Sequence, residues 1–143
     1  MKSIKKYILS ILLFVSVVLS YAQESSFNLD RQIYMHEPDS QTRNISLNVK
    51  KDITFMTLQI ASKINFGTLT IIIFNSKDEI VDEFSIENKT TSLDDFKTNN
   101  IQEVVTGQIT KSIKDPIPGK WKIKMVTEKA VGQVQYTSII YSN

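Results

Sequence analysis

Three lysines spaced two residues apart are the first candidates for chemistry in this sequence. They occur in "KWKIKM", residues 120 to 125, where each lysine is followed by an apolar side chain. Successive side chains of a β-strand point to opposite faces, so the lysines would share one face and the apolar residues the other. Such a cationic stripe suits anionic polymers such as lipopolysaccharide, acidic glycans or nucleic acid. The row consists of Lys120, Lys122 and Lys124.

The alternative for this row is the solvated face of an ordinary amphipathic strand, on which lysines protect a sheet edge from aggregation. Charge favours this alternative. The chain has 17 basic and 15 acidic residues, a net charge of +2, and removal of a leader that contains three lysines leaves −1. No aromatic residue shares the lysine face, so we expect these lysines to face water and we expect no nucleic-acid partner.

Aromatic residues near this row are the next candidates. Trp121, the only tryptophan, is in phase with Ile123 and Met125, which predicts that it packs in the core. Pro118 and Gly119 form the turn before this strand and set its register. If the lysine face binds a glycan, Tyr136 and Tyr141 are the aromatic residues that would assist it.

Metal and catalytic chemistry have little support. His36 is the sole histidine and the chain has no cysteine, so a zinc site and a Ser–His–acid triad both lack partners. Asp94 and Asp95 are the best oxygen ligands for a structural calcium ion, although they lack the spacing of a calcium-binding loop. Asp82 and Glu83 would point to opposite faces of a strand and cannot act as a pair. We therefore expect a protein that is not an enzyme and holds no cofactor.

The N-terminus has the pattern of a signal peptide. Lys2, Lys5 and Lys6 precede an uncharged apolar run of 12 residues, 8 to 19, and small residues occupy positions 20 and 22. This pattern predicts export and cleavage after residue 22. A retained membrane anchor is the alternative, but the run is short for a span of about 20 residues. The absence of cysteine excludes a lipoprotein leader.

The remaining chain must position these residues, and its hydrophobic period of two predicts strands. The predicted strands are 43–50, 53–60, 67–74, 79–86, 101–113, 120–127 and 130–141. Residues 75–78 and the tight hairpin 127–130 are predicted turns, and Gly107 is a candidate bulge. Ser92 and Asp95 indicate one short helical turn, and Ile80 is expected on the same face as Phe84 and Ile86.

Short strands at this spacing predict an all-β fold, a single antiparallel β-sandwich of about seven to eight strands over residues 43–143. A sheet closed on itself is the alternative. Residues 23–42 would form either an additional edge strand or a free tail.

The order of three segments resembles a known family. "FGTLTIIIFNSKDEIV" is followed by "PGKWKIKM" and then by "GQVQYTSII". Over about residues 43–141 the chain resembles the bacterial pre-peptidase C-terminal domain and the related P-domain-like jelly-roll modules. The resemblance implies a jelly-roll accessory domain without catalytic activity.

These observations predict an exported, non-catalytic module in the periplasm or at the cell surface, without a membrane span after cleavage. The favoured function is binding to another envelope or secreted protein through a sheet edge or a loop. The second candidate is binding of a cell-surface polysaccharide through the lysine face and the two tyrosines. The third candidate is a small hydrolase, for which His36 is the only candidate base, or a hydrolase inhibitor.

Overall fold

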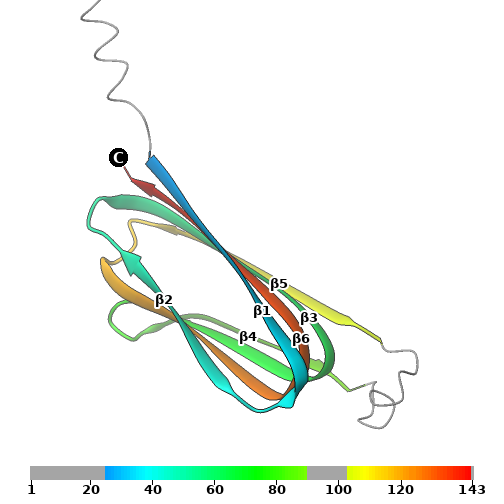
Figure 1. Ribbon diagram of the computed structural model, residues 1–143. Helices are drawn as coiled ribbons and strands as arrows, with labels where there is room; N and C mark the ends of the chain where they lie inside the picture. The colour runs from blue at the N-terminus through cyan, green and yellow to red at the C-terminus, as the bar shows by residue number, and fades with distance from the viewer. Residues whose placement is uncertain (1–24, 90–102, 143) are drawn as a thin grey trace, which may run out of the picture.

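The computed structural model describes residues 25–89 and 103–142 (Figure 1). The predicted signal peptide, the helical turn expected around Ser92 and the calcium candidates Asp94 and Asp95 lie outside the described residues.

The described residues form six antiparallel strands. These are β1 (Ser25–Asp39), β2 (Thr42–Val49), β3 (Ile53–Phe74), β4 (Ile80–Asn88), β5 (Val105–Lys114) and β6 (Gly119–Ser142). Two of them, β3 with 22 residues and β6 with 24, are far longer than the mean strand of about five to six residues.

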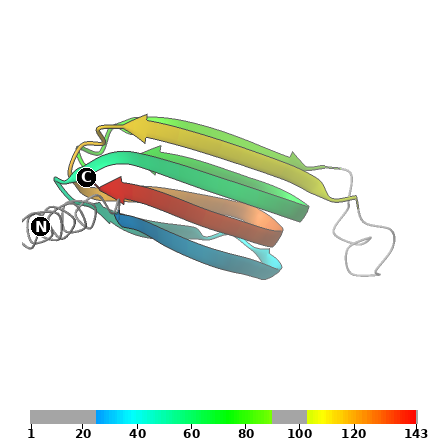
Figure 2. The same ribbon diagram turned by 90° about the horizontal axis from the view of Figure 1, so that it is seen from above.

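The two long strands bend and take part in both layers of a sandwich. Layer A contains β1, residues 130–142 of β6, residues 53–64 of β3, and β5, in that order (Figure 2). Layer B contains β2, residues 119–128 of β6, residues 67–74 of β3, and β4. The eight strand segments follow the order of a jelly roll. The predicted single antiparallel β-sandwich is therefore confirmed.

Two predicted boundaries inside the long strands are wrong. The segments 53–60 and 67–74 belong to one strand, and so do 120–127 and 130–141. Residues 127–130 form no hairpin, because both halves of β6 continue to pair with β3 on either side of the bend. The reason is that β3 and β6 bend together, so each remains hydrogen-bonded to the other while crossing from layer B to layer A.

Glycine makes the shared bend possible. Gly67 has a φ of +81°, a conformation that other residues rarely adopt. A side chain there would also fall on the backbone carbonyls of Glu128 and Lys129, while one at Gly132 would fall on the carbonyl of Lys63. The two strands therefore approach closely where they cross between the layers.

The core lies between the layers and follows the period of two. In β2, for example, Ile45, Leu47 and Val49 are buried, whereas the residues between them are exposed. The predicted position of Trp121 in the core is confirmed, since it is 3% exposed. The remaining buried apolar side chains come mainly from β3 and β6.

Two local predictions fail in the strands that flank β3. Ile80 is 59% exposed, because a register shift pairs it with Phe74 and reverses its phase relative to Phe84 and Ile86. Gly107 produces no bulge and pairs in register with Ser62. Its lack of a side chain instead makes room for Ile86, whose Cγ2 would lie 2.7 Å from an added Cβ.

Among the described residues, no helix is long and apolar enough to span a membrane.

Candidate functional site

The lysine row lies on the outer face of layer B, between β2 and β3. Its middle member, Lys122, is already engaged. The Lys122 Nζ lies 3.0 Å from Asp78 Oδ1 and 4.6 Å from the centroid of the Phe74 ring. Lys120 is exposed and Lys124 is half-buried. Because Asp78 balances the central charge, the row is not a continuous cationic stripe.

The turn residues before β6 position the tryptophan strand. Pro118 is exposed, and Gly119 begins β6 opposite Val49. The Trp121 Nε1 donates a hydrogen bond to the Ile117 carbonyl at 2.7 Å, which satisfies the only polar atom of the buried indole.

The two tyrosines proposed as ligand contacts do not join the lysine row. Tyr136 is 1% exposed and faces the core, so it is unavailable to a surface ligand. Its phase on β6 is that of Val134 and Ile140, which are both buried. Tyr141 is half-buried on the outer face of layer A, where its ring lies 5.9 Å from that of Phe55.

Tyr136 and its neighbour Ser138 are buried hydroxyl groups. Neither hydroxyl reaches hydrogen-bond geometry with a partner in the described part of the chain. Burial raises the pKa of Tyr136, because the charged phenolate loses hydration in the core. The nearby Ser138 hydroxyl and the Arg31 guanidinium lower this pKa, but burial dominates.

The structure brings no metal ligands together in the described ranges, where no group of three or more His, Cys, Asp or Glu residues is placed to hold an ion. His36 stacks on the Tyr34 ring, with centroids 5.6 Å apart and planes 9° from parallel. Asp82 pairs with Lys111, and Glu79 accepts a hydrogen bond from Asn75 Nδ2 at 2.7 Å.

The β4/β5 edge of the sandwich is closed by side chains that join the two layers. Lys111 Nζ from β5 lies 3.2 Å from Asp82 Oδ2 of β4. The Asn88 Nδ2 donates to the carbonyls of Ile64, Asn65 and Glu103, at 3.2, 3.0 and 2.5 Å. These contacts tie β4 to the bend of β3 and to the residues before β5.

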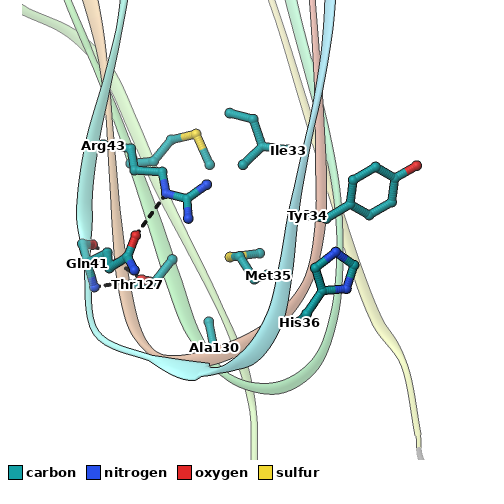
Figure 3. Close-up of a pocket in the computed structure, with 9 residues that line it drawn as sticks. Ile33, Tyr34, Met35, His36, Gln41, Arg43, Thr127 and Ala130 are labelled. Carbon is teal, nitrogen blue, oxygen red and sulfur yellow. Dashed lines mark hydrogen bonds between the residues drawn. The ribbon is translucent and has the colours of Figure 1, made fainter.

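The β1/β2 edge is open and contains two hollows between the layers. The first, of about 210 Å³, lies near the connection from β1 to β2 (Figure 3). There Ile33, Met35 and Arg43 point between the layers, whereas Tyr34 and His36 point away. The second, of about 680 Å³, has a floor that includes Leu29, Leu47 and Ile140. We refer to the β1/β2 edge with both hollows as the open edge.

Two arginines project into the open edge. They occupy positions at which the period-two alternation of β1 and β2 predicts apolar, inward-facing side chains. Arg31 pairs with Tyr136 and Arg43 pairs with Met125, and both partners face the core. Each arginine is nevertheless exposed, because the layers do not close over it. The Arg43 Nε donates to Gln41 Oε1 at 3.0 Å. An arginine in the apolar phase of each edge strand is the sequence signal by which this site could have been predicted.

Comparisons with known proteins identify no family. No family model matches the chain, and no curated protein does. Among solved structures, dimeric latent PorU from Porphyromonas gingivalis has 5% identity and a TM-score of 0.46 over 84% of this chain. Bacillus licheniformis lipase BlEst2 in its propeptide form has 16% identity and a TM-score of 0.49 over 85% of this chain. The chain spans only 13% and 23% of these two proteins.

A third similar structure, described as "CBM4 structure and function", has 9% identity and a TM-score of 0.40. The match covers 87% of this chain and 82% of the chain of that structure. The descriptions of these three structures name no pre-peptidase C-terminal domain. The β-sandwich that the resemblance implies is present in the structure, while membership of that family stays a prediction.

Proposed function

We propose that this protein is an exported, non-catalytic module that binds an extended segment of another envelope or secreted protein along its open edge. The observation that carries the proposal is the difference between the two edges. One is closed by Lys111, Asp82 and Asn88, and the other opens into two hollows above the core.

The backbone of β1 supports binding by strand addition. Residues 25–35 of β1 pair with β6 in continuous register, and in the described part of the chain no strand pairs with their other side. An extended peptide adding there would gain backbone hydrogen bonds, while its alternate side chains would reach the hollows.

The side chains of the open edge favour a particular peptide. Apolar residues form the floor, and the charged residues around it are Arg31, Arg43, Lys50 and Asp52. The excess of positive charge favours a partner segment in which apolar residues alternate with Asp or Glu. The arginines also act as inward-pointing charges that disfavour pairing with a second, uncharged edge strand.

Site-specific photocrosslinking in the native bacterium tests this proposal. A photoreactive residue in place of Asn48, which lines the larger hollow, should give a discrete protein adduct. The matched control is Glu83, an exposed residue of β4 on the far side of layer B. The adduct should be lost when Arg31 and Arg43 are both replaced by Glu.

The same experiment separates this site from the lysine row. Lys122→Ser with Lys124→Ser should leave the Asn48 adduct unchanged, since Asn48 lines the larger hollow and neither of these two lysines does. Identical adducts from positions 48 and 83, or an adduct indifferent to the arginines, would contradict the proposal.

A further inference from the structure

The outer face of layer A has an unusual concentration of carboxamide side chains. Five of the eight glutamines in the chain lie on it. Cross-strand pairing aligns them in rows; one row runs through Gln32, Gln135, Ala61 and Gln108. The carboxamides of this face, here named the amide face, are Asn28, Gln32, Gln59, Gln108, Gln133 and Gln135.

Hydroxyl groups of Ser and Thr occupy five further positions of the amide face. These residues are Thr57, Thr106, Thr110, Ser112 and Thr137. The charged side chains lie at its margins: Asp30 on the edge strand β1, and Lys63 and Lys114 at opposite ends. The interior of the face therefore carries no charged side chain, and besides its hydrogen-bonding groups it contains only the small Ala61 and the half-buried Ile139.

Much of this hydrogen-bonding capacity is unused within the protein. Gln135 Nε2 lies 3.4 Å from Asp30 Oδ2, and the Thr57 and Ser112 hydroxyls lie 3.4 Å apart. Among the described residues, the exposed side chains of Gln32, Gln59 and Gln108 make no hydrogen bond with other protein groups. A carboxamide offers both donors and an acceptor, so these groups suit a ligand that carries both functions.

Aromatic pairs mark the two ends of the amide face. Tyr34, which is 50% exposed, stacks on His36 at one end, and Phe55, which is 37% exposed, contacts Tyr141 at the other. Tyr34 pairs with Gln133 of β6, and Gln133 precedes Tyr141 by eight residues on the same strand. At a rise of about 3.3 Å per residue, the two aromatic pairs are therefore about 26 Å apart. A hollow of about 450 Å³, lined in part by His36, adjoins the first pair.

We infer that the amide face binds an extended, uncharged polysaccharide. The hydroxyl groups of a sugar act as both donors and acceptors, which matches carboxamides and hydroxyls, and exposed aromatic rings offer apolar surfaces to its C–H groups. A protein partner would require a broad apolar centre, and in the interior of this face, among the described residues, the apolar side chains are only Ala61 and the half-buried Ile139. An acidic polymer would require a cationic surface, and the lysines here lie only at the margins.

Affinity electrophoresis of the purified full-length chain tests this inference. Native gels would contain a soluble β-glucan, a galactomannan or a soluble α-glucan, with polygalacturonate as the acidic comparison. At least one neutral polymer should retard the protein, and the apparent affinity should change little when salt is raised, since no ion pair forms. Polygalacturonate should cause no comparable retardation.

Variants identify the face responsible. Gln135→Ala and Tyr34→Ala should each lower the apparent affinity for the neutral polymer about fivefold to tenfold, as expected from the loss of one contact side chain. Asn44→Ala removes an exposed carboxamide from β2 on the outer face of layer B and should change nothing. Replacing Arg31 and Arg43 by Glu should also leave the retardation by neutral polysaccharide unchanged. Failure of the peptide-binding proposal and failure of the polysaccharide-binding inference are therefore distinguishable.

Three results would overturn the inference. They are absence of retardation in all three neutral gels, retardation abolished by salt, and equal effects of Asn44→Ala and Gln135→Ala.

Discussion

At the scale of single residues, Tyr136 combines an apolar packing role with a hydroxyl group that has no hydrogen-bond partner among the described residues. Its ring extends from layer A into the core between the layers. Its hydroxyl and that of Ser138 are buried without hydrogen bonds in the described part of the chain. A buried hydroxyl without a partner costs free energy relative to hydration. The phenyl ring of Tyr136, and not its hydroxyl, is therefore what stabilises the fold.

We predict that Tyr136→Phe is neutral or stabilises the protein by up to about 1 kcal/mol at pH 7. The variant should also resist alkali better. The folded-state pKa of Tyr136 is raised, so above about pH 10 the unfolded chain releases this proton while the folded chain retains it. The wild type therefore loses stability as pH rises above about 10, and the variant loses less.

Urea denaturation at pH 7 and at pH 10.5 measures both effects. The difference between wild type and variant cancels the titration of the other groups. A variant that loses as much stability as the wild type on going to pH 10.5 would show that Tyr136 has an ordinary pKa.

At the scale of elements, the bend shared by β3 and β6 determines how one pair of strands serves two layers. We predict that Gly67→Ala destabilises the protein by about 3 kcal/mol or more, because it combines a left-handed φ with a clash against backbone carbonyls. Gly107→Ala should cost less, about 1 kcal/mol, since the atom it meets is the Cγ2 methyl of Ile86, a side-chain atom that can shift, and not backbone. Chemical denaturation compares the two, and equal losses would mean that the bend has no special backbone requirement.

Among the described residues, the carboxamide of Asn88 is the most connected side chain of the β4/β5 edge. Asn88 is 4% exposed and bonds three carbonyls from two other segments. We predict that Asn88→Ala costs about 2–3 kcal/mol, because the carbonyls lose their donor. Asn44→Ala, an exposed control, should change stability by less than about 0.5 kcal/mol. Faster amide exchange in the first residues of β5 would locate the effect, and unchanged exchange there would contradict it.

At the scale of the whole molecule, the two layers share β3 and β6. One layer therefore cannot unfold without disrupting the pairing of these two strands in the other layer. We therefore predict one cooperative unfolding transition. Trp121 fluorescence reports on layer B, and a dye on a cysteine introduced at the exposed Gln59 reports on layer A, in a chain that has no other cysteine. The two denaturation curves should coincide, and separate midpoints would show that the layers unfold independently.

The alternation of apolar and polar residues was sufficient to predict the all-β sandwich and the burial of Trp121. The same alternation also predicts the burial of Tyr136, which has the phase of Val134 and Ile140, so the prediction of a surface role for Tyr136 contradicts it. The alternation failed at Ile80, where a register shift relative to β3 changes the phase.

The sequence by itself therefore determined the all-β class and, where the register is unbroken, which side chains face inward, because the period of two acts within each strand. The tertiary structure alone decided that residues 53–74 and 119–142 are two bent strands, which edge is open, and that five glutamines share one face. These features depend on pairing between residues as distant as Asp30 and Thr137. Local periodicity carries no information about which strand a segment pairs with, so only the assembled sheet could reveal them.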